Sequence, residues 1–279
     1  MHPNWDNAAL LQAPLYTTMR PALERWGSPP DWPTLADYQR LLDGVKPPLL
    51  TAGGKPLHVV AQATEKTTDW RQGYEPQIYL QGALQTRLEC WHDAFNVLTW
   101  ASFPLAKAAL NARQYALLEA RAKAGAPAAR RSPSQDALTQ FDESGVIVLS
   151  ADPLLSELLL SFQWKPLFWQ QRAAVQTHMR CFLFGHGLME RALTPYRGLT
   201  GKGVILPITQ DFLAQPLALQ VTQVDGLLAQ VLGDGRQLLQ PRDLAPVPLL
   251  GFPGFTPDNE CADYYDDRTY FRPGRETKS

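Results

Sequence analysis

Two histidines and the polar residues near them are the strongest candidates for chemistry in this sequence. His186 and Glu190 are four residues apart in a segment with helical apolar periodicity, so their side chains would be neighbours on one helix face. His92 and Asn96 lie on the flank of a second apolar helical stripe, and Asp93 lies further round the same helix. We therefore predict His92, Asp93 and His186 as acid–base or ligand groups. Glu190 would orient a histidine, and Asn96 would contact substrate.

The same residues could hold a metal ion. Two imidazoles and a carboxylate from two helices form a ligand set that binds zinc or non-haem iron. The sequence thus offers His92, His186 and Glu190 as candidate ligands of Zn or Fe, although it contains no HExxH motif. Core histidines that bond only to protein groups are the alternative interpretation.

Further charged residues are predicted to bind or act on a substrate. Arg172 lies on the predicted face that carries His186, and a buried arginine requires a paired anion. We expect Arg172 or Lys107 to hold an anionic substrate. Asp142 is a further candidate catalytic carboxylate, at the expected tip of a hairpin. The combination favours an enzyme, a hydrolase or transferase acting on a small phosphorylated or carboxylated substrate.

Two other classes of function stay open. Residues 107–131 contain six Lys or Arg residues and one Glu, a composition that suits binding of RNA or another anionic partner. The third class is a structural or assembly protein in which the buried polar residues form a satisfied core network. The sequence alone does not decide the oligomeric state.

Composition restricts the class of protein. The chain has 279 residues, 45% of them hydrophobic, and a net charge of -1, which argues against a histone-like nucleic-acid binder. Its three cysteines are far apart and odd in number, as expected of a reduced cytoplasmic protein. No apolar run approaches the roughly 20 residues that span a bilayer, so no membrane partner is expected.

The pattern predicts an α+β fold, a predominantly helical single domain over residues 1–279. Within it we expect an N-terminal arm over 1–33, a mobile loop over 124–135 and a Pro-rich tail over 245–279 that wraps the body. A β-hairpin is predicted near residues 137–150. Apolar periodicity predicts helices, two of them long core helices that flank a cleft, over residues 81–100, 105–123, 166–193 and 222–233.

Several strings also carry a family resemblance. They include WHDAFN at 91–96, FPLAKAALN at 103–111 and DALTQFDESG at 136–145, followed by Gly185-His186. From about residue 70 to residue 272 the chain resembles the bacterial family DUF3025, a domain of unknown function. The resemblance implies a single cytoplasmic unit and carries no activity with it.

Overall fold

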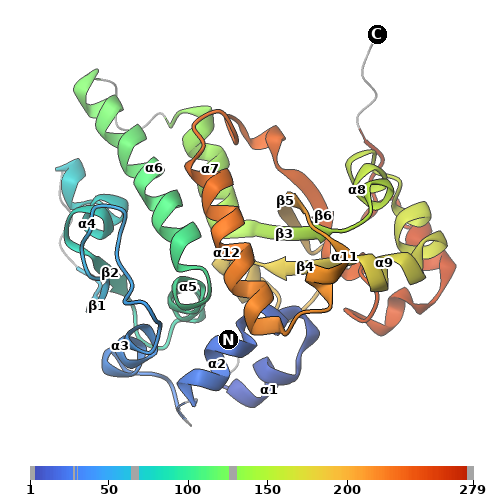
Figure 1. The fold of residues 1–279 in the computed structure, drawn as a ribbon, viewed down its shortest axis with the longest axis horizontal. Coiled ribbons are helices and arrows are strands. Elements are labelled where there is room, and N and C mark those ends of the chain that lie inside the picture. Colours follow the sequence, from blue (N-terminus) through green and yellow to red (C-terminus); the bar gives the residue numbers. More distant parts are fainter. Residues whose placement is uncertain (1–3, 28, 30, 64–68, 126–130, 275–279) are drawn as a thin grey trace.

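The computed structural model describes residues 4–27, 29, 31–63, 69–125 and 131–274, in which helices surround two small sheets (Figure 1). The longer helices are α3 (Leu35–Asp43), α4 (Tyr74–Gln81), α5 (Trp91–Ser102), α6 (Pro104–Lys123), α7 (Pro133–Ser144), α8 (Pro153–Leu160) and α12 (Leu217–Gly233). The shorter ones are α1 (Asn7–Gln12), α2 (Arg20–Trp26), α9 (Arg172–His178), α10 (His186–Arg191) and α11 (Gln210–Leu213). The strands are β1 (His58–Ala61), β2 (Ala83–Thr86), β3 (Gly145–Ser150), β4 (Met179–Leu183), β5 (Thr200–Pro207) and β6 (Ala245–Pro248).

The larger sheet is built around β3, in the order β4-β3-β5-β6. Every residue of β3 is buried, and its run of β-branched and aliphatic residues suits a central strand covered on both faces. It pairs antiparallel with β4, Val146 opposite Leu183, and parallel with β5. The first residue of β3 therefore lies opposite the end of β4. The smaller sheet consists of β1 and β2, which are parallel.

Side-chain caps fix where several helices begin. Thr34 and Asp37 form a capping box that starts α3. Ser132 and Gln135 form a second one, and it starts α7. The N-terminus of α6 is capped from a distance by Asp225 of α12, whose carboxylate accepts hydrogen bonds from the amides of the first turn at 2.8 and 3.0 Å.

One hydrophobic core runs through the described residues, from Trp5 to Phe271. Helix α12 packs against α6 in the middle of the molecule, and the small sheet lies on one side of this pair with the large sheet on the other (Figure 1). Helix α10 packs against both α5 and α7. These last contacts bring three helix termini together.

The mixed α+β class is confirmed, and so is the helix expected over 105–123, which is α6. The predicted hairpin near 137–150 is wrong. Residues 133–144 form α7, because Ala137, Leu138 and Phe141 bury one helical face, and β3 follows as a single strand that pairs with β4 and β5.

Two of the long predicted helices are also wrong in extent. Residues 166–193 divide into a π-helical segment, α9, the strand β4 and α10, because residues 179–183 pair with β3. The helix expected over 81–100 begins only at Trp91, since residues 83–86 pair with β1. The helix expected over 222–233 begins earlier, at Leu217.

The remaining segments connect these elements. Of the loop expected over 124–135, residues 126–130 lie outside the described residues, and its last three residues already belong to α7. In the C-terminal segment, β6 joins the large sheet, and short 3-10 turns follow it to residue 266. Residues 275–279 lie outside the described part of the chain. Across the described residues, every helix is too short or too polar to cross a membrane.

Asp225 gives the fold a specific dependence on pH. Burial raises the pKa of Asp225 to about 6, against the two backbone hydrogen bonds that lower it. An unfolded Asp has a pKa of about 3.9. The folded chain therefore holds this proton more tightly, so Asp225 contributes stability below about pH 4 that is lost as the pH rises through the folded pKa.

We expect Asp225→Asn to remove this contribution, because the amide keeps an acceptor and does not titrate. Between about pH 4 and 6, the free energy of unfolding of the wild type should fall relative to the variant by up to about 1.4 kcal/mol per pH unit. Denaturant unfolding at several pH values measures this difference, with exposed Asp211→Asn as the control. A constant difference between wild type and variant over this window would contradict the assignment.

Candidate functional site

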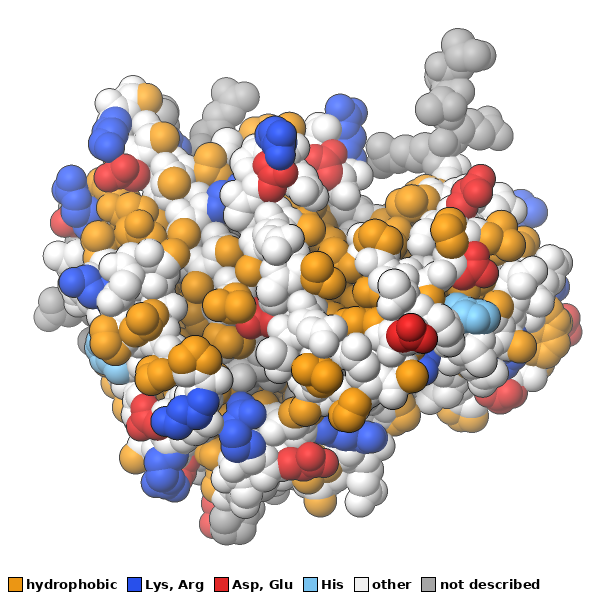
Figure 2. Space-filling view, viewed as in Figure 1, with side chains coloured by type: hydrophobic (Ala, Val, Ile, Leu, Met, Phe, Trp, Pro, Cys, Tyr) orange, Lys and Arg blue, Asp and Glu red, His pale blue; other side chains and the backbone are white. Residues whose placement is uncertain are grey.

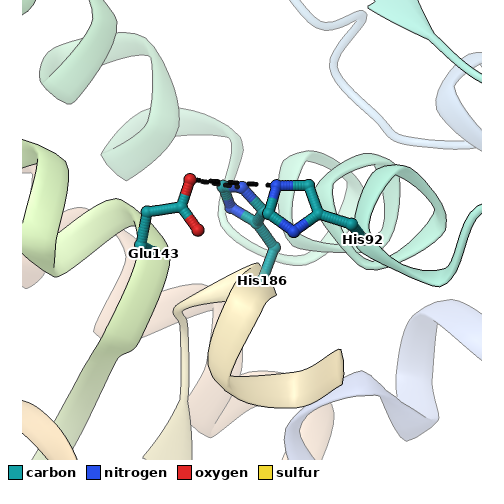
Figure 3. Close-up of side chains that lie close together, drawn as sticks. All are labelled: His92, Glu143 and His186. Carbon is teal, nitrogen blue, oxygen red and sulfur yellow. Dashed lines mark ion pairs between the residues drawn. The ribbon is translucent and has the colours of Figure 1, made fainter. Parts of the chain in front are cut away.

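Three side chains from three helix termini converge at one point (Figure 3). His92 comes from the first turn of α5, Glu143 from the last turn of α7, and His186 is the first residue of α10. The imidazole centroids are 4.4 Å apart and nearly perpendicular. Nε2 of His186 lies 3.5 Å from Oε1 of Glu143, and Nε2 of His92 lies 3.8 Å from the same oxygen.

The topology of the large sheet brings two of these residues together. Helix α7 ends where β3 begins, and α10 begins just after β4 ends. Because β3 and β4 are antiparallel, these two chain ends meet, and the amides of Phe184 and Gly185 both donate to the carbonyl of Gly145. Glu143 and His186 therefore become neighbours although they are far apart in the sequence.

Two glycines permit this close approach. A Cβ added to Gly185 would lie 2.3 Å from the backbone nitrogen of Gly145, and one added to Gly187 would lie 2.5 Å from Oε2 of Glu143. A larger residue at Gly185 would push α10 away from α7, and one at Gly187 would displace the carboxylate of Glu143. The site thus depends on Gly187 for space as well as on its functional side chains.

A carboxylate faces the other nitrogen of each histidine. Nδ1 of His92 lies 3.2 Å from Oε2 of Glu190, and Nδ1 of His186 lies 4.0 Å from Oδ2 of Asp142. His186 is only 5% exposed, and its Nδ1 has no hydrogen-bond partner in the described part of the chain. Both rings therefore direct Nδ1 toward a supporting carboxylate and Nε2 toward Glu143.

A buried ion pair lies behind His186. Nζ of Lys107 is 2.5 Å from Oδ1 of Asp142 and donates a second bond, of 3.0 Å, to Oδ1 of Asn96. Asn96 in turn donates to the hydroxyl of Tyr74. Burial alone would raise the pKa of Asp142, but the charges of Lys107 and His186 outweigh it and hold the pKa below its usual range. Asp142 is therefore an anion at neutral pH.

Glu143 is an anion as well. The imidazole of His186, as a hydrogen-bond donor and as a charge, lowers the pKa of Glu143 below its usual range, although partial burial opposes this. Glu143 is half-buried, with 43% of its side chain exposed. Its carboxylate is therefore ionised, close to both imidazoles, and accessible from a cavity.

The cavity beside these residues has a volume of about 550 Å³ and is mainly polar. It is lined by carboxylates, arginines, amides and hydroxyls that include Tyr74, Glu75, Arg87, His92, Asn96, Gln114, Arg121, Arg131, Gln135, Thr139, Asp142, Glu143 and His186. A volume of this size accommodates a small-molecule ligand.

Glu75 is a functional candidate that sequence reasoning misses. It lines the cavity from the first turn of α4, and its Oε2 accepts a hydrogen bond of 2.6 Å from Asn111. Burial, followed by the nearby charge of Asp142, raises the pKa of Glu75 to about 7. The sequence around Glu75 shows no regular pattern that would mark it as a site residue. Its partner Asn111 does lie in a distinctive string, FPLAKAALN.

The structure brings most of the sequence-predicted residues to this site. Asp93 also lines the cavity, but its carboxylate forms a bidentate pair with Arg87 at 2.9 and 3.0 Å, and this interaction lowers its pKa against the effect of burial. Arg172 lies elsewhere and donates to Asn259 and Glu260 of the C-terminal segment. Its anionic partner is a protein carboxylate.

The basic segment over 107–131 is not a uniform surface. Lys107 is buried in the ion pair, and Arg113 donates to backbone carbonyls near the end of α12. Lys123 pairs with Glu119 on the same helix. Arg121 and Arg131 line the cavity, and Arg130 lies outside the described residues. The charges of this segment therefore serve separate local contacts.

The pair of Lys107 and Asp142 should be essential for stability. Lys107→Met leaves a carboxylate buried without its cation, so we expect a loss of about 3–5 kcal/mol in the free energy of unfolding, measured by denaturant titration. The matched control is Lys165→Met, which breaks a more exposed pair with Asp266 and should cost less than about 1 kcal/mol. Lys107→Met combined with Asp142→Leu should recover much of the loss. Equal losses in the two single variants would contradict this role.

Comparisons with known proteins identify the family. The model of the family described as "Protein of unknown function (DUF3025)" matches residues 57–275. Searches of curated proteins and of solved structures find no match. The matched region contains every residue of the site, from Tyr74 to Glu190. Because the match covers most of the chain, this protein belongs to the DUF3025 family.

Proposed function

We propose that His92, Glu143 and His186 bind a divalent transition metal, zinc or iron, and that the protein is a metal-dependent enzyme acting on a small anionic substrate. The observation that carries this proposal is the convergence of two Nε2 atoms on one oxygen of Glu143, at 3.5 and 3.8 Å.

The spacing suits a metal ion. Ligand atoms bound at about 2.0–2.1 Å to a tetrahedral ion lie roughly 3.3–3.5 Å apart. The three ligand atoms all lie within 4.8 Å of one another, so small side-chain movements would close the set around an ion. Two histidines and one carboxylate leave coordination positions open, which is typical of catalytic zinc sites and of non-haem iron sites.

The supporting carboxylates strengthen the proposal. A histidine that binds a metal usually donates its other ring N–H to a carboxylate, a carbonyl or water, which fixes the ring and makes it a better ligand. Glu190 has this position relative to His92, and Asp142 faces His186. In this arrangement Glu143 is the ligand and Glu190 orients His92.

The cavity suits a small polar anion. Arg121 and Arg131 contribute positive charge, and a divalent ion would add to it. The charge of Arg87 is already paired with that of Asp93. Gln114, Gln135 and Thr139 add neutral hydrogen-bonding groups to the lining. A phosphate or carboxylate ester is the substrate class that this combination favours.

Hydrolysis is the reaction that these groups could perform together. When bound, an ion held by His92, Glu143 and His186 would make a water molecule more acidic and so supply the nucleophile for attack on phosphorus or on the carbonyl carbon. The bond to the leaving oxygen then breaks, and Glu75, with a pKa near 7, supplies a proton to that oxygen. The proton released by the water restores Glu75, so the atoms balance.

Metal binding provides the first test. We expect about one Zn or Fe(II) per wild-type chain, measured by equilibrium dialysis and elemental analysis, and loss of that ion in His92→Ala and Glu143→Gln. Glu190→Gln should weaken binding by about 10- to 100-fold, because it removes a supporting carboxylate. His58→Ala, which changes an exposed histidine that does not line the cavity, is the control. Undiminished metal content in both ligand variants would exclude this site and favour a satisfied polar core.

Activity provides the second test. The metal-loaded protein should hydrolyse a chromogenic phosphomonoester or carboxylic ester, and Glu143→Gln should abolish this activity. Glu75→Gln should retain the metal and lower kcat by about 10²- to 10⁴-fold, because it removes only the proton donor. An unchanged kcat in Glu75→Gln would remove Glu75 from the reaction.

A further inference from the structure

A second cavity, of about 690 Å³, differs in character from the polar one. It lies where α2, the segment after α3, the end of α5 and the beginnings of α6 and α12 meet. Its lining is mostly aliphatic and proline side chains, and it includes Ala22, Val45, Pro47, Pro48, Leu49, Leu50, Ala101, Pro104, Leu105 and Val221. None of its lining residues lines the polar cavity.

This cavity leaves large apolar side chains in contact with water. Leu50 is 52% exposed and Leu105 is 59% exposed, and both contribute to its wall. Figure 2 shows apolar side chains over this part of the face, where α6 and α12 begin, with Lys and Arg side chains below them. Apolar surface grouped around a hollow and bordered by polar residues is typical of a ligand site.

Two cations at this cavity have no carboxylate partner among the described residues. Arg25 donates only a long bond, of 3.4 Å, to the carbonyl of Ala101, and Lys46 donates to the carbonyl of Asp43. Both side chains belong to exposed residues that line the cavity. They can therefore bind an anionic group without breaking an existing ion pair.

The carboxylate in the lining does not compete for these cations. Asp225 is 4% exposed, and both of its oxygens accept backbone N–H groups at the start of α6. Both oxygens of Asp225 are therefore already used in the helix cap. The charges that remain available for a ligand at this cavity are those of Arg25 and Lys46, which are positive and lie beside an apolar wall.

We infer that this cavity binds a free medium-chain fatty acid. The hydrocarbon chain would lie against the apolar wall, and the carboxylate would pair with Arg25 and Lys46. Arginine binds carboxylates through two parallel hydrogen bonds, which suits a single acidic headgroup. The volume lies within the range for small-molecule ligands, which favours one acyl chain over a protein partner.

Titration calorimetry with octanoate, decanoate and laurate, below their micelle concentrations, tests the apolar part of this inference. Affinity should rise about two- to fourfold for each added CH₂, because each one buries more apolar surface. Leu105→Gln should reduce this gain. Equal affinity across the series would overturn the inference.

The charged part is tested with headgroups of matched chain length. Decanoate should bind more tightly than decanol, and decyltrimethylammonium should bind most weakly. Arg25→Gln with Lys46→Gln should abolish the preference for decanoate over decanol, whereas the control pair Arg40→Gln with Lys55→Gln, which removes the same charge elsewhere on the surface, should keep it. Retention of the preference in the first pair would overturn the assignment.

Two further measurements separate this site from other possibilities. Glu143→Gln should still bind decanoate, since the two cavities share no residues, so failure at one site leaves the other standing. Binding to vesicles of anionic phospholipid without binding to decanoate would identify a membrane surface as the ligand and overturn the fatty-acid site.

Discussion

The buried pair between Lys107 and Asp142 is the interaction on which the site depends. It joins α6 to the last turn of α7, where Glu143 is the next residue along the chain. Removing either charge would leave the other buried without a partner, which is costly in a low-dielectric interior. The pair therefore holds the end of α7 in place, and the position of Glu143 relative to His186 follows from it.

The same pair also explains why a cluster of charged side chains is stable inside an apolar core. Asp142 gives one oxygen to Lys107 and directs the other toward His186, so a single buried anion supports both a cation and an imidazole. The ammonium group of Lys107 also donates a hydrogen bond to the side-chain oxygen of Asn96. Polar networks in a protein interior are stable when their members are satisfied, and most members of this one are.

Sequence reasoning predicted the partners of this site better than the path that brings them together. Helical periodicity correctly placed His92 on a helix beside an apolar face, and its meeting with His186 was expected from two such helices. The second helix does not have the predicted extent, because β4 interrupts it. Pairing between strands is a long-range effect that overrides local periodicity. The residues around 179–183 do not reveal that this segment pairs with β3, because β3 lies about 30 residues earlier in the chain.

Glu143 illustrates the same limit. Adjacent acids before a glycine are typical of an exposed turn, so the sequence predicts that DESG at 142–145 forms the tip of a hairpin. The capping box at Ser132 and the burial of Phe141 make the segment a helix, and the end of that helix turns Glu143 toward two imidazoles. Glu75 is a stronger case, since its raised pKa comes from burial and from Asp142, a residue distant in sequence. Neither property can be read from the residues next to it.

Within the described residues, Nδ1 of His186 has no hydrogen-bond partner, and this supports the geometric reasons for regarding the cluster as a binding site. A buried polar atom without a hydrogen bond costs about 1–3 kcal/mol, and folded proteins retain few of them. Asp142 lies 4.0 Å away, just beyond hydrogen-bond distance. A cation bound at Nε2 would make the Nδ1 proton more acidic and would draw it toward that carboxylate. A bound metal would thus complete a contact that the described residues leave open, between Nδ1 of His186 and Asp142.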